Sequence, residues 1–148
     1  MPQKVPEGYN AVTPYLYYRD ADAALEFITG VLGAKEKFKM AGEDGRVAHA
    51  EVEFGGGVVM LGTPGPDYRN PNDLGGRTAG VYVYIDDVDG HFDRVKEGGA
   101  KITEEPTDKF YGDRSYGCLD PEGHQWWFAT HVKEVPMEEM QAAMASSN

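Results

Sequence analysis

The chain of 148 residues repeats part of its own sequence. Residues 15–28, YLYYRDADAALEFI, match residues 82–95, YVYIDDVDGHFDRV, at a constant offset. After a slip of one residue, the tripeptide GAK at 33–35 falls on the GAK at 99–101. The correspondences that share the residue type include Tyr15 with Tyr82, Tyr17 with Tyr84 and Asp20 with Asp87. A repeat of this length predicts two similar supersecondary units in one chain.

Each half of the chain has the hydrophobic pattern of one strand, one helix and three further strands. Asp20 and Asp87 suit helix starts, because an acidic side chain complements the N-terminal helix dipole. The predicted helices cover about 20–32 and 87–98, and the strands that follow them cover about 35–41, 46–54, 57–62, 100–106, 114–119 and 124–130. We therefore predict an α+β fold of two tandem βαβββ units, at about residues 9–64 and 79–132.

Two segments lie outside the repeat, within what we take to be a single domain of residues 1–148. The linker, residues 65–78, is rich in Pro, Gly and Asn, and a long connection without structure is often functional. It could cover a cleft or let the two halves pair across a dimer, and we expect a homodimer. The tail, residues 133–148, predicts a short helix whose methionines Met137, Met140 and Met144 form a packing side.

The composition excludes several classes of partner. Acidic residues outnumber basic residues by 25 to 14, and the formal net charge is −11. Nucleic acid and anionic membranes need a concentrated basic face, so we expect neither as a partner. No apolar stretch approaches the roughly 20 residues that cross a bilayer, and the N-terminus lacks the apolar region of a secretory signal. The single Cys118 excludes an internal disulfide; we expect it to be buried, in a cytoplasmic protein.

Three segments resemble the vicinal oxygen chelate superfamily, which holds glyoxalases, bleomycin resistance proteins and dioxygenases. They are PYLYYRDADAALEFITGVLGAKE at 14–36, RVAHAEV at 46–52 and YGDRSYGCLDPEGHQWWFATH at 111–131, and the resemblance covers about residues 9–132. It implies curved mixed sheets around a ligand cleft, the glyoxalase/bleomycin resistance fold. Enzymes of the superfamily hold one metal in that cleft through His, Glu or Gln side chains, and the metal chelates vicinal oxygens of the substrate.

The resemblance also locates the positions of those metal ligands in this chain. They fall on Thr13, Gly80, Trp127 and, with the register uncertain by one residue, on Val59 or Met60. None of these side chains suits a site built from nitrogen and carboxylate ligands. We therefore predict that the protein binds no metal and no cofactor.

The histidines could still supply a metal site of a different kind. His49 and Glu51 alternate along one strand and point to the same face, so they could act as two ligands if a third, such as Glu53, joined them. The alternative interpretation is a polar pair beside the cleft. The other histidines are expected elsewhere: His124 in a turn, with a hydrogen bond to the backbone, and His91 and His131 in solvent.

Strand alternation predicts which side chains line the cleft. The aromatic ones are Tyr15, Tyr17, Tyr82, Tyr84 and Trp127, and the polar ones are His49, Glu51 and Gln125. Arg114 is placed near the cleft mouth, where it could hold an anionic group or pair with Asp113 or Asp120. The alternative interpretation is that the tyrosines fill the space between two sheets as ordinary core, because aromatic residues favour strands in general.

These features predict a metal-free protein that holds a flat aromatic compound, cations included, by stacking and by charge on the rim. Such a protein could confer resistance by sequestering the compound. The alternative is a metal-dependent lyase, isomerase or dioxygenase that acts on a vicinal-oxygen substrate. The sequence alone assigns no catalytic residue.

Overall fold

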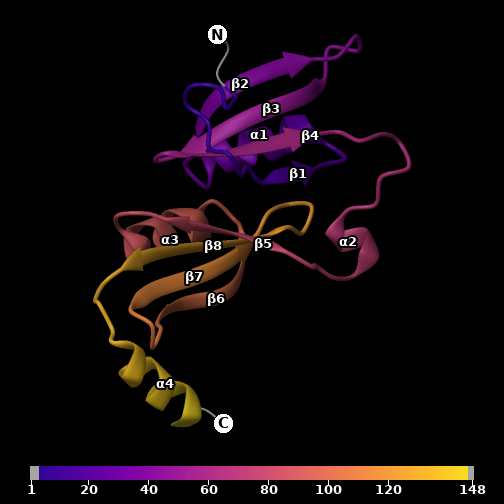
Figure 1. Ribbon diagram of the computed structural model, residues 1–148. Coiled ribbons are helices and arrows are strands. Elements are labelled where there is room, and N and C mark those ends of the chain that lie inside the picture. The colour runs from indigo at the N-terminus through magenta and orange to yellow at the C-terminus, as the bar shows by residue number, and fades with distance from the viewer. Residues whose placement is uncertain (1–3, 147–148) are drawn as a thin grey trace. The chain divides into compact units, whose positions relative to one another are not determined.

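The computed structural model describes residues 4–146 and divides the chain into two compact units. The first unit contains the chain up to Ala79 together with the turn Asp120–His124. The second unit contains Gly80–Leu119 and the chain from Gln125 onward. Each unit has the order strand, helix and three strands (Figure 1), so the predicted α+β fold of two βαβββ units is confirmed.

The first unit is a mixed sheet with the strand order β1-β4-β3-β2. Strand β1 runs parallel to β4, and the other neighbours are antiparallel. The helix α1 packs chiefly on β3 and buries Ala24 and Ile28 against the sheet. The elements are β1 (Tyr15–Tyr17), α1 (Ala21–Gly30), β2 (Lys35–Ala41), β3 (Val47–Phe54) and β4 (Gly57–Gly62).

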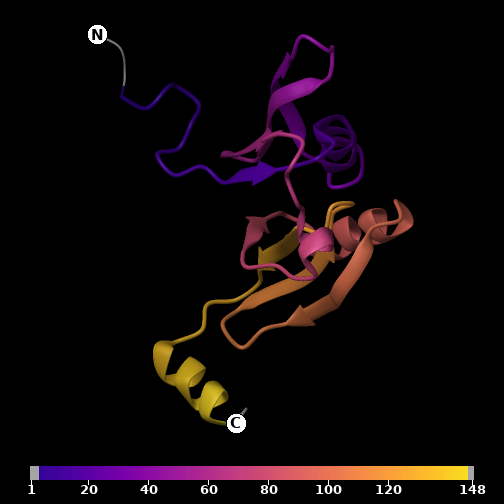
Figure 2. The ribbon, with the colours of Figure 1, turned by 90° about the vertical axis from the view of Figure 1, so that its right-hand side faces the viewer.

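The second unit repeats this arrangement with the strand order β5-β8-β7-β6. Strand β5 runs parallel to β8, and the remaining neighbours are antiparallel. The helix α3 lies along one side of the sheet, as Figure 2 shows. The elements are β5 (Gly80–Tyr84), α3 (Val88–Glu97), β6 (Lys101–Asp108), β7 (Asp113–Leu119) and β8 (Gln125–His131).

The helices α1 and α3 begin at the aspartates expected from the repeat. The side chain of Asp20 accepts a hydrogen bond from the backbone N–H of Ala23 at 3.0 Å, and that of Asp87 accepts one from Gly90 at 3.1 Å. Each aspartate thus satisfies one of the N–H groups that have no partner inside the helix.

The helix side of the second sheet forms an aromatic core that includes a histidine. Trp126, Phe128 and Tyr116 are all fully buried there, and the thiol of Cys118 is buried as expected. His91 of α3 is only 7% exposed, and its Nδ1 lies 2.6 Å from the hydroxyl of Tyr116. The prediction that His91 is solvated was therefore wrong, because the helix face that packs on the sheet contains this position.

The linker is not without structure, because it contains the short helix α2 (Pro71–Leu74). The side chain of Asn70 accepts a hydrogen bond from the backbone of Asp73, and the side chain of Asp73 accepts one from the backbone of Asn70. This reciprocal capping box stabilises a helix of one turn. Gly75 ends the helix at a φ of 75°, where a side chain would be strained.

The tail forms the helix α4 (Met137–Ser146), in which no residue is buried. Met137 and Met144 are 65% and 57% exposed, so two of the three methionines on the expected packing side remain largely in solvent, whereas Met140 is half-buried. In Figures 1 and 2, α4 lies apart from the sheet of its own unit. None of the helices within residues 4–146 has the length and apolar character that crossing a bilayer requires.

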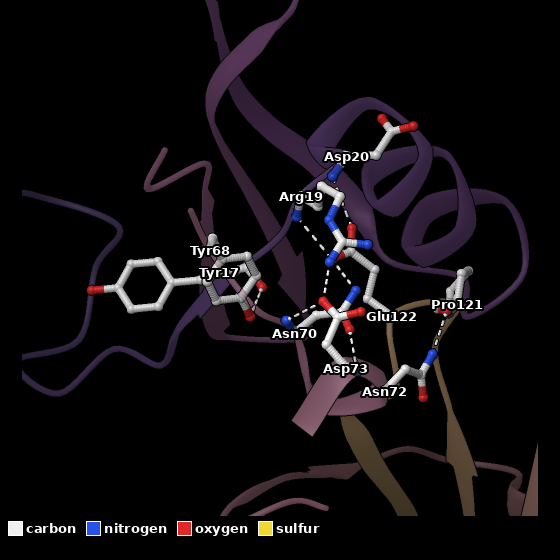
Figure 3. A network of polar contacts seen from close by, with 9 residues as sticks. All are labelled: Tyr17, Arg19, Asp20, Tyr68, Asn70, Asn72, Asp73, Pro121 and Glu122. Carbon is white, nitrogen blue, oxygen red and sulfur yellow. Dashed lines mark hydrogen bonds and ion pairs between the residues drawn. The ribbon is translucent and has the colours of Figure 1, made fainter. Parts of the chain in front are cut away.

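The turn between β7 and β8 locks the start of α1 through the carboxylate of Glu122 (Figure 3). This carboxylate accepts hydrogen bonds from the backbone N–H groups of Arg19 and Asp20, both at 2.8 Å, and from Asn70 Nδ2 at 3.0 Å. Glu122 is 8% exposed, so water cannot easily replace it. One buried side chain therefore joins the turn, the helix α1 and the residue that caps α2.

We expect Glu122→Ala to lower the free energy of unfolding by about 3 kcal/mol, because three donors lose a charged acceptor in a buried place. Urea denaturation followed by circular dichroism measures the change. The matched control is Glu138→Ala on α4, which should change stability by less than about 0.5 kcal/mol. Equal effects of the two substitutions would contradict the assigned role of Glu122.

Candidate functional site

Each sheet has one face that its helix does not cover, and we call this the open face. In the second sheet, Trp126 and Phe128 are buried on the α3 side, so Trp127 points to the opposite side. The parallel pairing of β5 with β8 places Tyr82 beside Trp127, and Tyr84 follows on the same side. The second open face therefore gathers the aromatic residues that strand alternation predicted for it.

The indole of Trp127 spreads over both strands that neighbour β8. A Cβ placed on Gly117 of β7 would lie 2.6 Å from Cζ3 of Trp127, and one on Gly80 of β5 would lie 3.5 Å from its Cδ1. The absence of a side chain at Gly117 leaves room for the ring, whereas the distance at Gly80 is an ordinary van der Waals contact. Beside the partly exposed Trp127, Tyr82 and Tyr84 are 42% and 62% exposed. This part of the second open face thus presents aromatic surface to solvent.

Asp113 is the polar centre of the second open face, with a side chain that is only 3% exposed. Its Oδ2 accepts hydrogen bonds from the hydroxyls of Tyr82 at 2.7 Å and Tyr84 at 2.9 Å. Its Oδ1 lies 2.7 Å from Nδ1 of His131. Burial acts to raise the pKa of Asp113, but the hydrogen bonds from these three residues outweigh it and hold the pKa below its usual value. Asp113 is therefore an ionised acceptor.

His131 bridges two carboxylates, with Nε2 lying 3.0 Å from Glu134 while Nδ1 contacts Asp113. The hydrogen bonds to Asp113 and then to Glu134 raise the pKa of His131 above its usual value. Its side chain is 42% exposed, but it is not simply solvated as predicted. Sequence reasoning considered Asp113 only as a partner of Arg114. The even spacing of Trp127 and His131 along β8 was the available signal that these two side chains lie on one face.

The first open face contains a comparable network of tyrosine, histidine and a buried acid. Nδ1 of His49 lies 3.0 Å from the hydroxyl of Tyr15, and its Nε2 lies 2.8 Å from the carboxylate of Glu51. The hydroxyl of Tyr9 donates a hydrogen bond to the other oxygen of Glu51. Burial acts to raise the pKa of Glu51, but the hydrogen bonds from His49 and Tyr9 lower it overall. The role of Tyr9 was missed because it lies outside the repeat.

Tyr17 completes the first open face and is 50% exposed. Its ring contacts that of Tyr15 at 5.4 Å between centroids, and its backbone carbonyl accepts a hydrogen bond from the Tyr68 hydroxyl at 2.9 Å. The same carbonyl lies 2.8 Å from Nε2 of His124, which confirms the backbone hydrogen bond expected for that histidine.

Two residues predicted to bind ligand have their polar groups engaged elsewhere. Arg114 alternates with Asp113 along β7 and lies on the helix side, where it pairs with Asp89 of α3 and with Asp108. Arg114 therefore forms surface ion pairs, but with other acids than the two expected. Its side chain does not lie on the open face. The amide nitrogen of Gln125 lies within hydrogen-bond distance of Thr103 and of two backbone carbonyls, so its two protons are used within the second sheet.

The structure resolves the uncertain register of the metal-ligand positions. Tyr15 pairs with Met60 as Tyr82 pairs with Trp127, so Met60 is the position equivalent to Trp127. The positions at which the resembled enzymes hold metal are then Thr13, Met60, Gly80 and Trp127, and these residues do not fit such a metal. Across residues 4–146, no three His, Cys, Asp or Glu side chains are grouped so that they could hold a metal ion.

A polar hollow of about 340 Å³ lies in the first unit, beside the start of α1. Its acidic side chains already have partners: Glu122 caps α1, Asp73 pairs with Arg19, and Asp20 caps α1 and pairs with Arg46. The acids of this hollow therefore serve the hydrogen bonds and ion pairs around the start of α1. The open faces remain the candidate sites.

Comparison with known proteins gave a family and several relatives. Residues 9–128 match the family described as Glyoxalase/Bleomycin resistance protein/Dioxygenase superfamily. An uncharacterized protein of Mycobacterium tuberculosis strain H37Rv is 35% identical over 141 residues, which cover 92% of this chain and 83% of the relative.

Solved structures show the same fold. TioX from Micromonospora sp. ML1 is 32% identical, with a TM-score of 0.67 over 83% of this chain and 99% of that protein. TnmS3, an antibiotic-binding protein from Streptomyces sp. CB03234, has a TM-score of 0.64 over 84% of this chain and 100% of its own. At 19% identity, the likeness to TnmS3 concerns the fold alone.

We expect the contact between Asp113 and His131 to contribute most to stability at mildly acidic pH. The raised pKa of His131 means that its contribution is full below the ordinary value of 6.5 and is lost as the pH rises through the folded-state pKa. The lowered pKa of Asp113 means that its contribution is full above the ordinary value of 3.8 and is lost as the pH falls through the folded-state pKa.

Melting temperatures measured across this range test the assignment. His131→Gln should flatten the decrease above pH 6.5, whereas Lys133→Gln, a neighbouring surface substitution, should leave the profile unchanged. Superimposable profiles for the wild type and His131→Gln would show that the contact has no such effect.

Proposed function

The chain belongs to the glyoxalase/bleomycin resistance protein/dioxygenase superfamily, and we propose that it binds a flat aromatic small molecule without a metal. The second open face is the proposed site, and the platform formed by Trp127 carries the proposal. Sequestration of such a compound would make the chain a resistance protein.

The physical support is the combination of an exposed aromatic surface with a fixed position. Trp127 lies between Gly80 and Gly117, and the hydroxyls of Tyr82 and Tyr84 are anchored on Asp113. Aromatic pairs add about 0.5–1.5 kcal/mol beyond the burial of their area. Because the rings are already held in place, a ligand that stacks on them loses little free energy in ordering them.

The charge of the chain supports a neutral or cationic ligand. The formal net charge is −11, and an acidic field attracts cations and repels anions. The fold also supports the proposal, since TnmS3 shares it and binds an antibiotic. The competing metal-dependent enzyme has less support, because His49 and Glu51 contact each other and the inherited ligand positions hold no suitable side chain.

We expect Trp127→Ala to weaken the binding of planar aromatic probes, such as acridines and phenazines, by at least about tenfold. Gly117→Ala should weaken it as well although the indole is still present, because the new Cβ displaces the ring. Phe110→Ala, which removes an exposed aromatic ring from a turn, is the control and should not change affinity.

Isothermal titration calorimetry measures these affinities, and added EDTA should not alter them. If no planar probe binds the wild type, the proposed function is wrong. If binding requires an added divalent metal, the metal-dependent enzyme is the better interpretation.

The proposal includes a homodimer, supported by the exposed methionines of α4. A helix of ten residues is marginal in water by itself, and burial of Met137 and Met144 against a second copy would stabilise it. Light scattering at micromolar concentration should give twice the chain mass of 16.3 kDa. Met137→Glu combined with Met144→Glu should restore the monomer, and a monomeric wild type would refute this part of the proposal.

A further inference from the structure

The hydroxyl protons of the second open face point inward. Tyr82 and Tyr84 both lie within hydrogen-bond distance of a single atom, Oδ2 of Asp113, at 2.7 and 2.9 Å. A carboxylate can only accept hydrogen bonds, and a tyrosine hydroxyl has one proton to donate. Each tyrosine hydroxyl therefore donates its proton to Asp113, and only its lone pairs remain to accept a hydrogen bond from a ligand.

This orientation is held in place by the other contacts of Asp113. Its second oxygen receives the Nδ1 proton of His131 at 2.7 Å, and the whole side chain is only 3% exposed. Neither oxygen of Asp113 can turn toward a ligand without breaking a charge-assisted hydrogen bond. The tyrosine hydroxyls thus cannot rotate outward at little cost.

Of the two hydroxyls, that of Tyr84 is the more available to a ligand. Tyr84 is 62% exposed, whereas Tyr82 is 42% exposed. The lone pairs of the Tyr84 hydroxyl are therefore the more accessible acceptor at the edge of the aromatic surface.

The first open face follows the same rule with different residues. Tyr9 donates its proton to the buried Glu51, and His49 contacts Glu51 through Nε2. Nδ1 of His49 lies 3.0 Å from the hydroxyl of Tyr15. On both faces, a buried acid thus accepts the proton of at least one tyrosine.

We propose that the second open face selects aromatic ligands that carry N–H or O–H donors on one edge, because Asp113 fixes Tyr84 and Tyr82 as acceptors. The inference rests on the proposed function and adds the chemical class of the ligand. An amino or hydroxyl group beside the stacked rings satisfies the tyrosine oxygens. A ligand edge that carries only acceptors faces lone pairs and leaves its own acceptors without partners.

Two neutral probes of the same shape separate the effect of hydrogen-bond donors on affinity from the effects of charge and size. They are 2,3-diaminophenazine, which presents donors, and 2,3-dimethylphenazine, in which methyl groups replace the amines. Wild-type protein should bind the diamine at least about tenfold more tightly, the effect of one well-formed hydrogen bond beside an equal stacking area. Titration calorimetry of both probes gives this selectivity ratio directly.

Asp113→Asn should lower the ratio, because an amide nitrogen donates, and a tyrosine hydroxyl that accepts from it turns its own proton outward. Stacking on Trp127 remains, so the dimethyl probe should still bind. The matched control is Asp108→Asn, the same change at an exposed acid that pairs with Arg114 of the same unit. Its ratio should equal that of the wild type.

Tyr84→Phe tests the same idea without altering Asp113, in case Asp113→Asn does not fold. It removes the more exposed acceptor and should weaken the binding of the diamine more than that of the dimethyl probe, which lowers the selectivity ratio. Equal binding of the two probes by the wild type overturns the inference while the proposed function stands. An unchanged ratio in both Asp113→Asn and Tyr84→Phe also overturns it. If neither probe binds, the proposed function fails, and the inference fails with it.

Discussion

The parallel pairing of the first strand with the last strand in each unit determines which side chains can act together. It places Tyr15 opposite Met60 and Tyr82 opposite Trp127. A shift of one residue would turn the tyrosines toward the helix and bury their hydroxyls in the apolar core. The pairing is possible because a helix connects the strands, since parallel neighbours need a long crossover. The contacts of both open faces depend on this register.

The open faces are ordered by buried acids rather than by packing alone. Glu51 and Asp113 are 6% and 2% exposed, and an isolated charge at such a position would be costly. Hydrogen bonds from tyrosine and histidine offset that cost, and they fix the rings as a consequence. The same principle acts at Glu122, where the donors are backbone N–H groups and the result is a locked helix start. Acids in this protein stabilise the fold at several places by accepting hydrogen bonds.

Much of the fold could be predicted from sequence, because its signals are local. The repeat, the alternation of the strands and the caps Asp20 and Asp87 all involve residues near one another in the chain. The faces of Trp126 and Trp127 follow from alternation alone. The helix α2 was missed because its capping box consists of single polar residues within a linker rich in Pro and Gly.

The sequence by itself determined the two units, the strand faces and the gathering of tyrosines on the faces that the helices leave open, since these follow from periodicity. Only the tertiary structure decided the partners within those faces. Tyr82 and Asp113 are 31 positions apart, and Asp113 and His131 are 18 apart. The direction of a hydrogen bond depends on which donor and acceptor the strand pairing brings within about 3 Å. No local pattern contains that information, so the acceptor character of the tyrosines appears only in the folded chain.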